Sequence, residues 1–358
     1  MNEEMKFEER IIELRSSVTS RIMLLDGALG TLIQTYKLSE EDWRGEQFAD
    51  WPQALKGNND LLCLSRPELI LGIHEQYLKA GADIILTNTF NANQISQADY
   101  GLEEYVVDIN RTAAKLARQA ADRHTEMTPE RPRFVAGSLG PTNRTASISP
   151  DVDRPGLRNT NFDQLYAAYN EASGALIDGG VDILLLETIF DTLNAKAALF
   201  AIKDVIEQRG KNIPVMVSGT VTDMSGRNLS GQTVEAFWHS IRHVKPFSVG
   251  LNCAFGADHL RPHLKELARV ADTYVCAYPN AGLPNHMGEY DEGPEKTASF
   301  LRQWAEEGIV NIVGGCCGTT PAHIESIANS IQGIAPREIP ETGRFMRLSG
   351  LEALTLRT

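Results

Sequence analysis

The sequence contains no apolar run that approaches the ~20 residues a helix needs to cross a bilayer. Its first residues, MNEEMKFEER, are charged and lack the apolar segment of a signal peptide. Positive charge is also scarce, with 34 Lys and Arg against 47 Asp and Glu and a formal net charge of −13. Such a chain lacks the excess positive charge that binding to nucleic acid or an anionic membrane requires. We therefore expect a cytoplasmic protein that binds small molecules or other proteins.

Cysteines are few: there are five, an odd number, and two of them are adjacent. In a reducing compartment this pattern favours thiol or metal chemistry over a disulfide framework. The glycine-rich G-x-G-x-x-G turn that opens many doubly wound nucleotide-binding sheets is absent as well. A doubly wound open sheet is therefore the weaker of the two architectures that we consider.

Eight short apolar runs alternate with longer segments of helical periodicity. Uninterrupted apolar runs between helices are typical of parallel strands that are buried on both faces. Eight strand–helix units over roughly 310 residues predict a (β/α)8 TIM barrel over 22–333, preceded by a helix at 1–21 and followed by a linker at 334–358. The polar stretch 36–59 is expected to be an insertion over the barrel rim. The predicted strands are 22–26, 83–87, 133–138, 181–187, 214–219, 248–253, 274–279 and 310–315.

Polar side chains gather where these predicted strands end. In TIM barrels the carboxyl ends of the strands form the face on which active sites are built. We therefore expect the functional residues to lie on this rim. They are Asp26, Asn88, Asn143, Glu187, Thr220, Asn252, Cys253, Asn280, Cys316 and Cys317.

Three of these residues suggest a metal. Cys253 ends the sixth strand, and Cys316 and Cys317 follow the eighth. Inward-facing residues of alternate barrel strands meet in one layer, so the three sulfurs can converge. Glycines at 314, 315 and 318 allow unusual backbone dihedral angles, which would let both adjacent thiols reach one ion.

Three protein ligands and an open fourth position are the arrangement of catalytic zinc. Zinc deprotonates a coordinating thiol, and three thiolate ligands keep that sulfur nucleophilic, which suits alkyl transfer to sulfur. Two other interpretations stay open. The cysteines can be small core residues, or the zinc can be purely structural in a non-catalytic module.

The chain resembles the N-terminal homocysteine-binding module of cobalamin-dependent methionine synthase along almost its whole length. The matching motifs are LDGALGT at 25–31, GNNDLL at 57–62, TNTF at 87–90, GPTNRTASISPD at 140–151, ETIFDTLNAKAA at 187–198, SGTVTD at 218–223, SGQT at 230–233, GLNCAFG at 250–256, YPNAGLPN at 278–285, GGCCGTTP at 314–321 and RLSGLEAL at 347–354.

This resemblance implies a methyltransferase with catalytic zinc at the C-terminal rim of the barrel, held by Cys253, Cys316 and Cys317. Without substrate, Asn280 is the implied fourth ligand. The activated homocysteine thiolate accepts a methyl group from methylcobalamin to give methionine, the last step of methionine biosynthesis. The cobalamin-binding and folate-binding modules would belong to the same chain or to partner chains. The alternative is a stand-alone homocysteine S-methyltransferase with a sulfonium or betaine donor.

The amino-acid end of homocysteine requires two complementary charges. Its ammonium group calls for carboxylates, and Asp26 and Glu187 are the acidic residues at strand ends. Its carboxylate group can be bound by Gly219, Thr220 and the backbone of 27–31, with Asn88 orienting these groups. Asp26 could instead cap a turn, and Glu187 could pair with a structural arginine.

Overall fold

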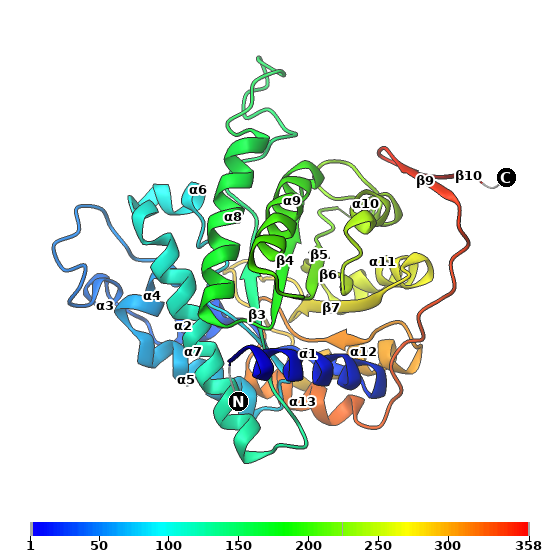
Figure 1. Cartoon of the computed structure of the whole chain (residues 1–358), viewed down its shortest axis with the longest axis horizontal. Coiled ribbons are helices and arrows are strands. Elements are labelled where there is room, and N and C mark those ends of the chain that lie inside the picture. The colour runs from blue at the N-terminus through cyan, green and yellow to red at the C-terminus, as the bar shows by residue number, and fades with distance from the viewer. Residues whose placement is uncertain (1–2, 224, 357–358) are drawn as a thin grey trace.

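Eight parallel strands form one nearly closed barrel in the computed structural model, which describes residues 3–223 and 225–356 (Figure 1). The strand order is β1-β8-β7-β6-β5-β4-β3-β2. The circle closes where Leu25, just after β1, bridges to Ile84 of β2 in parallel. The prediction of a (β/α)8 barrel is therefore confirmed, and the doubly wound open sheet is excluded.

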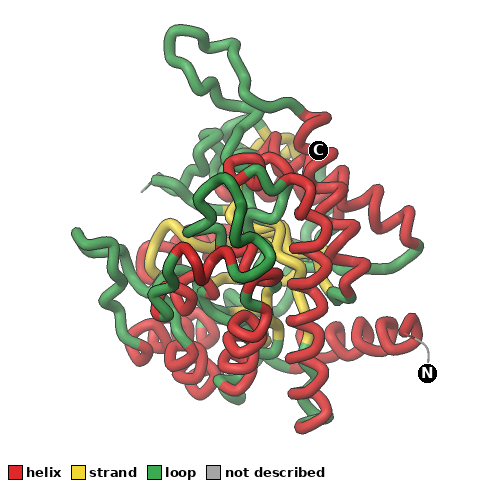
Figure 2. The backbone as a smooth tube through the Cα atoms, turned by 90° about the vertical axis from the view of Figure 1, so that its left-hand side faces the viewer, coloured by secondary structure: helices red, strands yellow, loops and turns green. Residues whose placement is uncertain are grey.

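All eight predicted strands are present, with ends that differ by at most three residues. Figure 2 shows the strands inside a shell of helices. The strands are β1 Met23–Leu24, β2 Ile84–Leu86, β3 Phe134–Leu139, β4 Ile183–Ile189, β5 Val215–Gly219, β6 Ser248–Gly256, β7 Tyr274–Asn280 and β8 Ile312–Val313.

The long helices follow the strands in the expected alternation. Short helices that the periodicity did not predict lie between β1 and the second long helix and after β2. The long helices are α1 Glu3–Ser20, α5 Pro67–Lys79, α7 Val106–Met127, α8 Phe162–Gly179, α9 Thr192–Arg209, α11 Ala257–Val270, α12 Pro294–Glu306 and α13 Pro321–Ile331. Helix α10 Val234–Ile241, which follows β5 in the same alternation, is shorter, with eight residues. The short ones are α2 Leu29–Thr35, α3 Glu40–Arg44, α4 Leu62–Ser65 and α6 Gln94–Gln97.

Two hydrophobic clusters explain why this pattern folds as a barrel. One cluster lies between the strands and the surrounding helices. The other fills the barrel interior with alternate strand residues such as Phe134, Leu185 and Met216. Leu14 and Val18 of α1 belong to this inner cluster and are fully buried. The N-terminal helix therefore closes one end of the barrel interior.

The C-terminal tail contains a hairpin that the sequence analysis did not anticipate. Strands β9 (Met346–Ser349) and β10 (Ala353–Leu356) pair antiparallel beside α10 (Figure 1). The Ser349 hydroxyl donates a hydrogen bond of 2.6 Å to the Ala236 carbonyl oxygen. The predicted linker at 334–358 is thus partly ordered against the barrel. No helix in the described part of the chain is both long and apolar enough to span a membrane.

Candidate metal and substrate site

Three cysteine sulfurs meet at the carboxyl end of the barrel. Cys253 lies in β6, and Cys316 and Cys317 follow β8. Their Sγ atoms all lie within 4.8 Å of one another, and the Cys253 and Cys317 sulfurs are 3.8 Å apart. Cys253 has a φ angle of +57°, a left-handed conformation that a non-glycine residue rarely adopts. Such backbone strain persists where the surrounding structure enforces it, often at functional sites.

The glycines around the cysteine pair act mostly through close packing. A Cβ atom at Gly314 would lie 2.6 Å from the Leu25 Cβ, and one at Gly315 would lie 2.4 Å from the Thr319 hydroxyl oxygen. Only Gly318 has a positive φ, of +80°. The expectation that all three glycines supply unusual dihedral angles is therefore wrong for 314 and 315. There the absence of a side chain lets the β8 end pack against β1 and the following turn.

The three thiols share their protons unequally. Hydrogen bonds from the Cys253 and Cys316 thiols lower the pKa of Cys317, which stabilises a thiolate there. The same contacts raise the pKa of Cys316 well above its usual value. A thiolate at Cys317 beside two further cysteine sulfurs is suited to a soft cation.

A buried amide oxygen is a further possible donor to a metal ion at the thiol cluster. Asn280 ends β7, between the two strands that carry the cysteines in the sheet order. Its side chain is 3% exposed, and its Oδ1 atom has no hydrogen-bond partner in the described structure. Buried polar atoms without a partner are costly and call for an explanation. Three sulfurs and an orphaned oxygen are donors that fit a tetrahedral zinc ion.

Two carboxyl groups lie near the sulfurs at the barrel mouth. Burial raises the pKa of Asp26 well above its usual value, and the charge of Glu187 adds to this effect. Burial likewise raises the pKa of Glu187 to about 7. The Ser138 hydroxyl donates to Glu187 at 2.5 Å, and the Leu86 amide donates to Asp26 at 2.8 Å. Neither carboxylate has a cationic partner among the described contacts, so Glu187 is not paired with a structural arginine.

These groups line one cavity of about 750 Å³. It also includes Asn88 and the 27–31 backbone. None of its described lining residues is Lys, Arg or His, whereas four are acidic: Asp26, Asp60, Glu187 and Glu289. A buried cavity of this character favours cationic groups such as an ammonium.

Two residues predicted to contact substrate are not among those that line this cavity. Gly219 and Thr220 line a separate small recess. The Thr220 amide donates to the Ile189 carbonyl oxygen, and a Cβ at Gly219 would lie 2.9 Å from the Phe237 ring. The backbone here takes part in the β4–β5 ladder and in packing, and the role of Gly219 and Thr220 in carboxylate binding stays a prediction.

The sequence analysis did not identify Tyr290 as part of the site. Its side chain lines the cavity, and its hydroxyl group interacts with the Cys317 sulfur. Its ring packs so closely on Gly318 that a Cβ there would lie 2.4 Å from the Tyr290 Cβ. Tyr290 lies in the long loop before α12, far from any strand end, so neither strand position nor spacing indicates it. The aromatic residue in a GEYD segment was the one available signal.

Asp60 is a buried acid at the edge of the same cavity. It is 2% exposed; its Oδ1 accepts a hydrogen bond of 3.2 Å from the Asn91 amide, whereas Oδ2 has no partner in the described structure. Burial raises its pKa to about 7. The folded state then binds this proton more tightly than the unfolded chain, whose Asp pKa is about 3.9. Asp60 therefore destabilises the fold increasingly as pH rises from about 4 to 7.

Replacing Asp60 with Asn should remove this pH dependence. We expect the unfolding free energy of D60N, relative to the unchanged chain, to rise by about 2–4 kcal/mol between pH 5 and pH 8. Chemical denaturation of both proteins with a chelator present measures this difference. The exposed Asp50→Asn is the matched control and should show no such trend. A D60N difference that is equally flat would show that Asp60 ionises normally.

A nearly closed barrel with three convergent thiols and two buried carboxyl groups where its strands end has the architecture of a barrel enzyme. The chain belongs to the homocysteine S-methyltransferase family, because the model of that family matches residues 23–331. It is therefore a methyltransferase, and methyl transfer to homocysteine is the reaction of its family.

Solved structures agree with this fold. The homocysteine methyltransferase MmuM from Escherichia coli in its metallated form is 23% identical, with a TM-score of 0.66. The match covers 86% of this chain and 96% of that one. The oxidized form of the same protein is 22% identical with a TM-score of 0.67, over 86% of this chain and 95% of that one. At these identities the similarity concerns the fold alone.

Proposed function

We propose that Cys253, Cys316 and Cys317 bind a catalytic zinc ion and that the thiol of homocysteine takes the fourth position. The convergence of the three sulfurs within 4.8 Å is the observation that carries this proposal. Bound zinc lowers the pKa of a coordinated thiol, so the substrate sulfur is a nucleophile at neutral pH. Asn280 is the fourth donor when substrate is absent.

The chain itself orients the substrate. Asp26 and Glu187 hold the ammonium group, since both are buried next to the sulfurs without a cation of their own. Backbone amides of 27–31 bind the carboxylate, and Asn88 stays in place through a hydrogen bond of 2.7 Å to the Asn59 carbonyl oxygen. Fixing both charged groups at the amino-acid end of the substrate places its sulfur at the thiol cluster, which is positioning rather than acid–base catalysis.

The proposed methyl donor is methylcobalamin, carried by another module of the same or a partner chain. Methylcobalamin would supply the methyl group to the homocysteine sulfur held at Cys253, Cys316 and Cys317, and the cofactor would keep the electron pair of the bond that breaks. The product would be methionine, so the reaction would be the last step of methionine biosynthesis in the cytoplasm. The motifs that extend through RLSGLEAL at 347–354 support this donor. In this proposal 22–333 is the catalytic barrel and 334–358 leads toward a folate-binding module.

A sulfonium or betaine donor is the second candidate. The cavity has four acidic lining residues and no Lys, Arg or His among those described, a lining that attracts a cationic donor. To decide, the zinc-loaded chain is incubated with homocysteine and either methylcobalamin, S-methylmethionine or betaine, and methionine is quantified. We expect slow transfer from methylcobalamin. Transfer from a sulfonium or betaine, with none from methylcobalamin, would replace the first proposal with the second.

The contact between Tyr290 and Cys317 leads to a further prediction. Partners that hydrogen-bond to metal ligands typically contribute 10- to 100-fold to metal affinity. We therefore expect Tyr290→Phe to weaken zinc binding about tenfold in competition with a chelator. In the cobalt-substituted protein, the sulfur-to-metal charge-transfer band should move to lower energy, since the thiolate loses a donor.

The control for this variant is Tyr166→Phe, which removes a hydroxyl that donates to Asp204 at 3.0 Å on the surface. It should leave both the zinc affinity and the cobalt spectrum unchanged. An unshifted spectrum in Tyr290→Phe would mean that the Tyr290 hydroxyl does not act on the metal ligands.

A further inference from the structure

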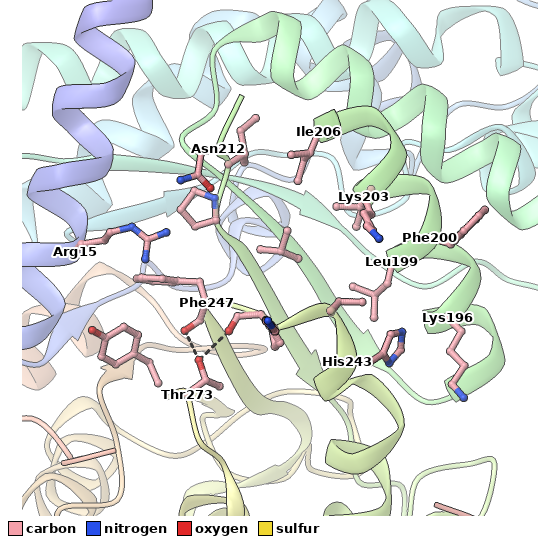
Figure 3. Close-up of a pocket in the computed structure, with 18 of the residues that line it drawn as sticks. Arg15, Lys196, Leu199, Phe200, Lys203, Ile206, Asn212, His243, Phe247 and Thr273 are labelled. Carbon is pink, nitrogen blue, oxygen red and sulfur yellow. Dashed lines mark hydrogen bonds between the residues drawn. The ribbon is translucent and has the colours of Figure 1, made fainter. Parts of the chain in front are cut away.

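A second cavity, of about 860 Å³, lies at the barrel end opposite the thiol cluster (Figure 3). Val215 and Tyr274, which begin β5 and β7, and Phe247, which precedes β6, line it. Parallel strands all begin at one end of a barrel and finish at the other. Because Cys253 and the carboxyl groups lie where the strands finish, this cavity is separate from the proposed active site.

The cavity exists because neighbouring helices differ in length. Helix α9 has 18 residues, whereas α10 has only eight and is followed by the 3-10 turn Arg242–Val244. The α9 residues Lys196, Leu199, Phe200, Lys203 and Ile206 line the cavity at spacings of three and four residues, so they share one helix face. The short partner helix leaves part of this face uncovered, and Phe200 is 53% exposed.

The charge of this cavity is opposite to that of the chain. Five basic residues line it, and none of its described lining residues is Asp or Glu, although the chain as a whole has a net charge of −13. Four acidic residues are adjacent to the lining in sequence: Asp163, Asp204, Glu207 and Asp272. Two of them are engaged elsewhere, since Asp204 accepts from Tyr166 and Asp272 pairs with Arg242. The basic residues are Arg15, Lys196, Lys203, His243 and Lys245.

Aromatic and aliphatic surface lies between these charges. The Arg15 guanidinium is 5.7 Å from the centre of the Phe247 ring, which packs at 5.1 Å on Tyr274. In Figure 3, Arg15 lies on one side of the cavity near Phe247, and Lys203 lies on the other side near Leu199. The floor is buried, since Phe247 is 7% exposed. The cavity therefore combines an apolar floor with a cationic rim.

We propose that this cavity binds a small organic anion with an apolar body, such as an aromatic carboxylate, sulfonate or phosphate. The volume falls within the range of about 300–1,000 Å³ that is usual for small-molecule sites. The apolar part of the ligand lies on Phe247 and on the exposed face of α9, while its anionic group is held by Lys203 and the neighbouring cations. The proposal does not depend on the reaction of the thiol cluster.

Two fluorescent probes that differ by one charge test this proposal. 8-Anilinonaphthalene-1-sulfonate carries a sulfonate, and N-phenyl-1-naphthylamine has the same aromatic body without it. We expect the native protein to bind one equivalent of the sulfonate probe. Lys203→Glu should weaken that binding about tenfold, because attraction becomes repulsion. Binding of the uncharged probe should change less than about twofold.

Lys115→Glu makes the same charge change on the exposed surface of α7, outside the cavity, and serves as the matched control. It should leave the affinities of both probes unchanged, as should Cys316→Ala. Three results would overturn the proposal: no saturable binding of the sulfonate probe, equal losses in Lys203→Glu and Lys115→Glu, or displacement of the probe by homocysteine, which would place it in the active-site cavity. Tight binding of an acidic peptide that excludes the sulfonate probe would instead assign the surface to a protein partner.

Discussion

Replacing Cys316 with Ala should weaken zinc binding more than about 100-fold and abolish homocysteine binding, while the barrel stays folded. Loss of partners that merely hydrogen-bond to ligands already costs 10- to 100-fold, so loss of a ligand itself should cost more. The fold should survive because its stability comes from the two hydrophobic clusters, which exist without a metal. Zinc content, isothermal titration with homocysteine and circular dichroism measure the three properties.

The matched control is Cys276→Ala. Cys276 is 1% exposed inside the barrel and lies outside the sulfur cluster, so this variant should keep both zinc and homocysteine. If Cys316→Ala unfolds while Cys276→Ala does not, the zinc is structural, because a structural metal contributes folding free energy directly. Zinc-edge X-ray absorption adds a direct test: the fourth ligand should change from oxygen or nitrogen to sulfur when homocysteine is added.

Replacing Glu187 with Gln should weaken homocysteine binding by about 2–4 kcal/mol, or roughly 30- to 1,000-fold, with zinc retained. The substitution keeps the shape of the side chain and its contact with Ser138 but removes the charge that would hold the substrate ammonium. Titration of the zinc-loaded variant with homocysteine measures the loss. Zinc analysis of the same sample separates substrate binding from metal binding.

Glu171→Gln makes the same chemical change at a partly buried site on α8, outside the cavity. It should bind homocysteine as the unchanged chain does. Unaltered affinity in Glu187→Gln would refute its role as an ammonium ligand and leave Asp26 as the single candidate. Loss of zinc in that variant would show instead that Glu187 supports the metal site.

The barrel fold and several residues of the cavity could be predicted from the local sequence pattern. Continuous apolar runs such as 183–186 are typical of strands buried between helices, and eight such strands in alternation leave few folds open. Asp26, Asn88, Glu187 and the three cysteines were identifiable because each lies at a strand end. Gly219 and Thr220 also lie at a strand end but do not line the active-site cavity, and their backbone takes part in the ladder to Ile189 and in packing on Phe237, so their role in substrate binding stays a prediction.

The sequence by itself determined that the chain forms a barrel and that Cys253, Cys316 and Cys317 belong to one rim, because strand periodicity and strand ends are local properties of the chain. Tertiary structure alone decided which groups share a cavity. Tyr290 reaches Cys317, Asn280 keeps an unpartnered oxygen, and α9 remains uncovered beside a short α10. These outcomes depend on contacts between residues far apart in the chain, and spacing along one segment carries no information about such contacts.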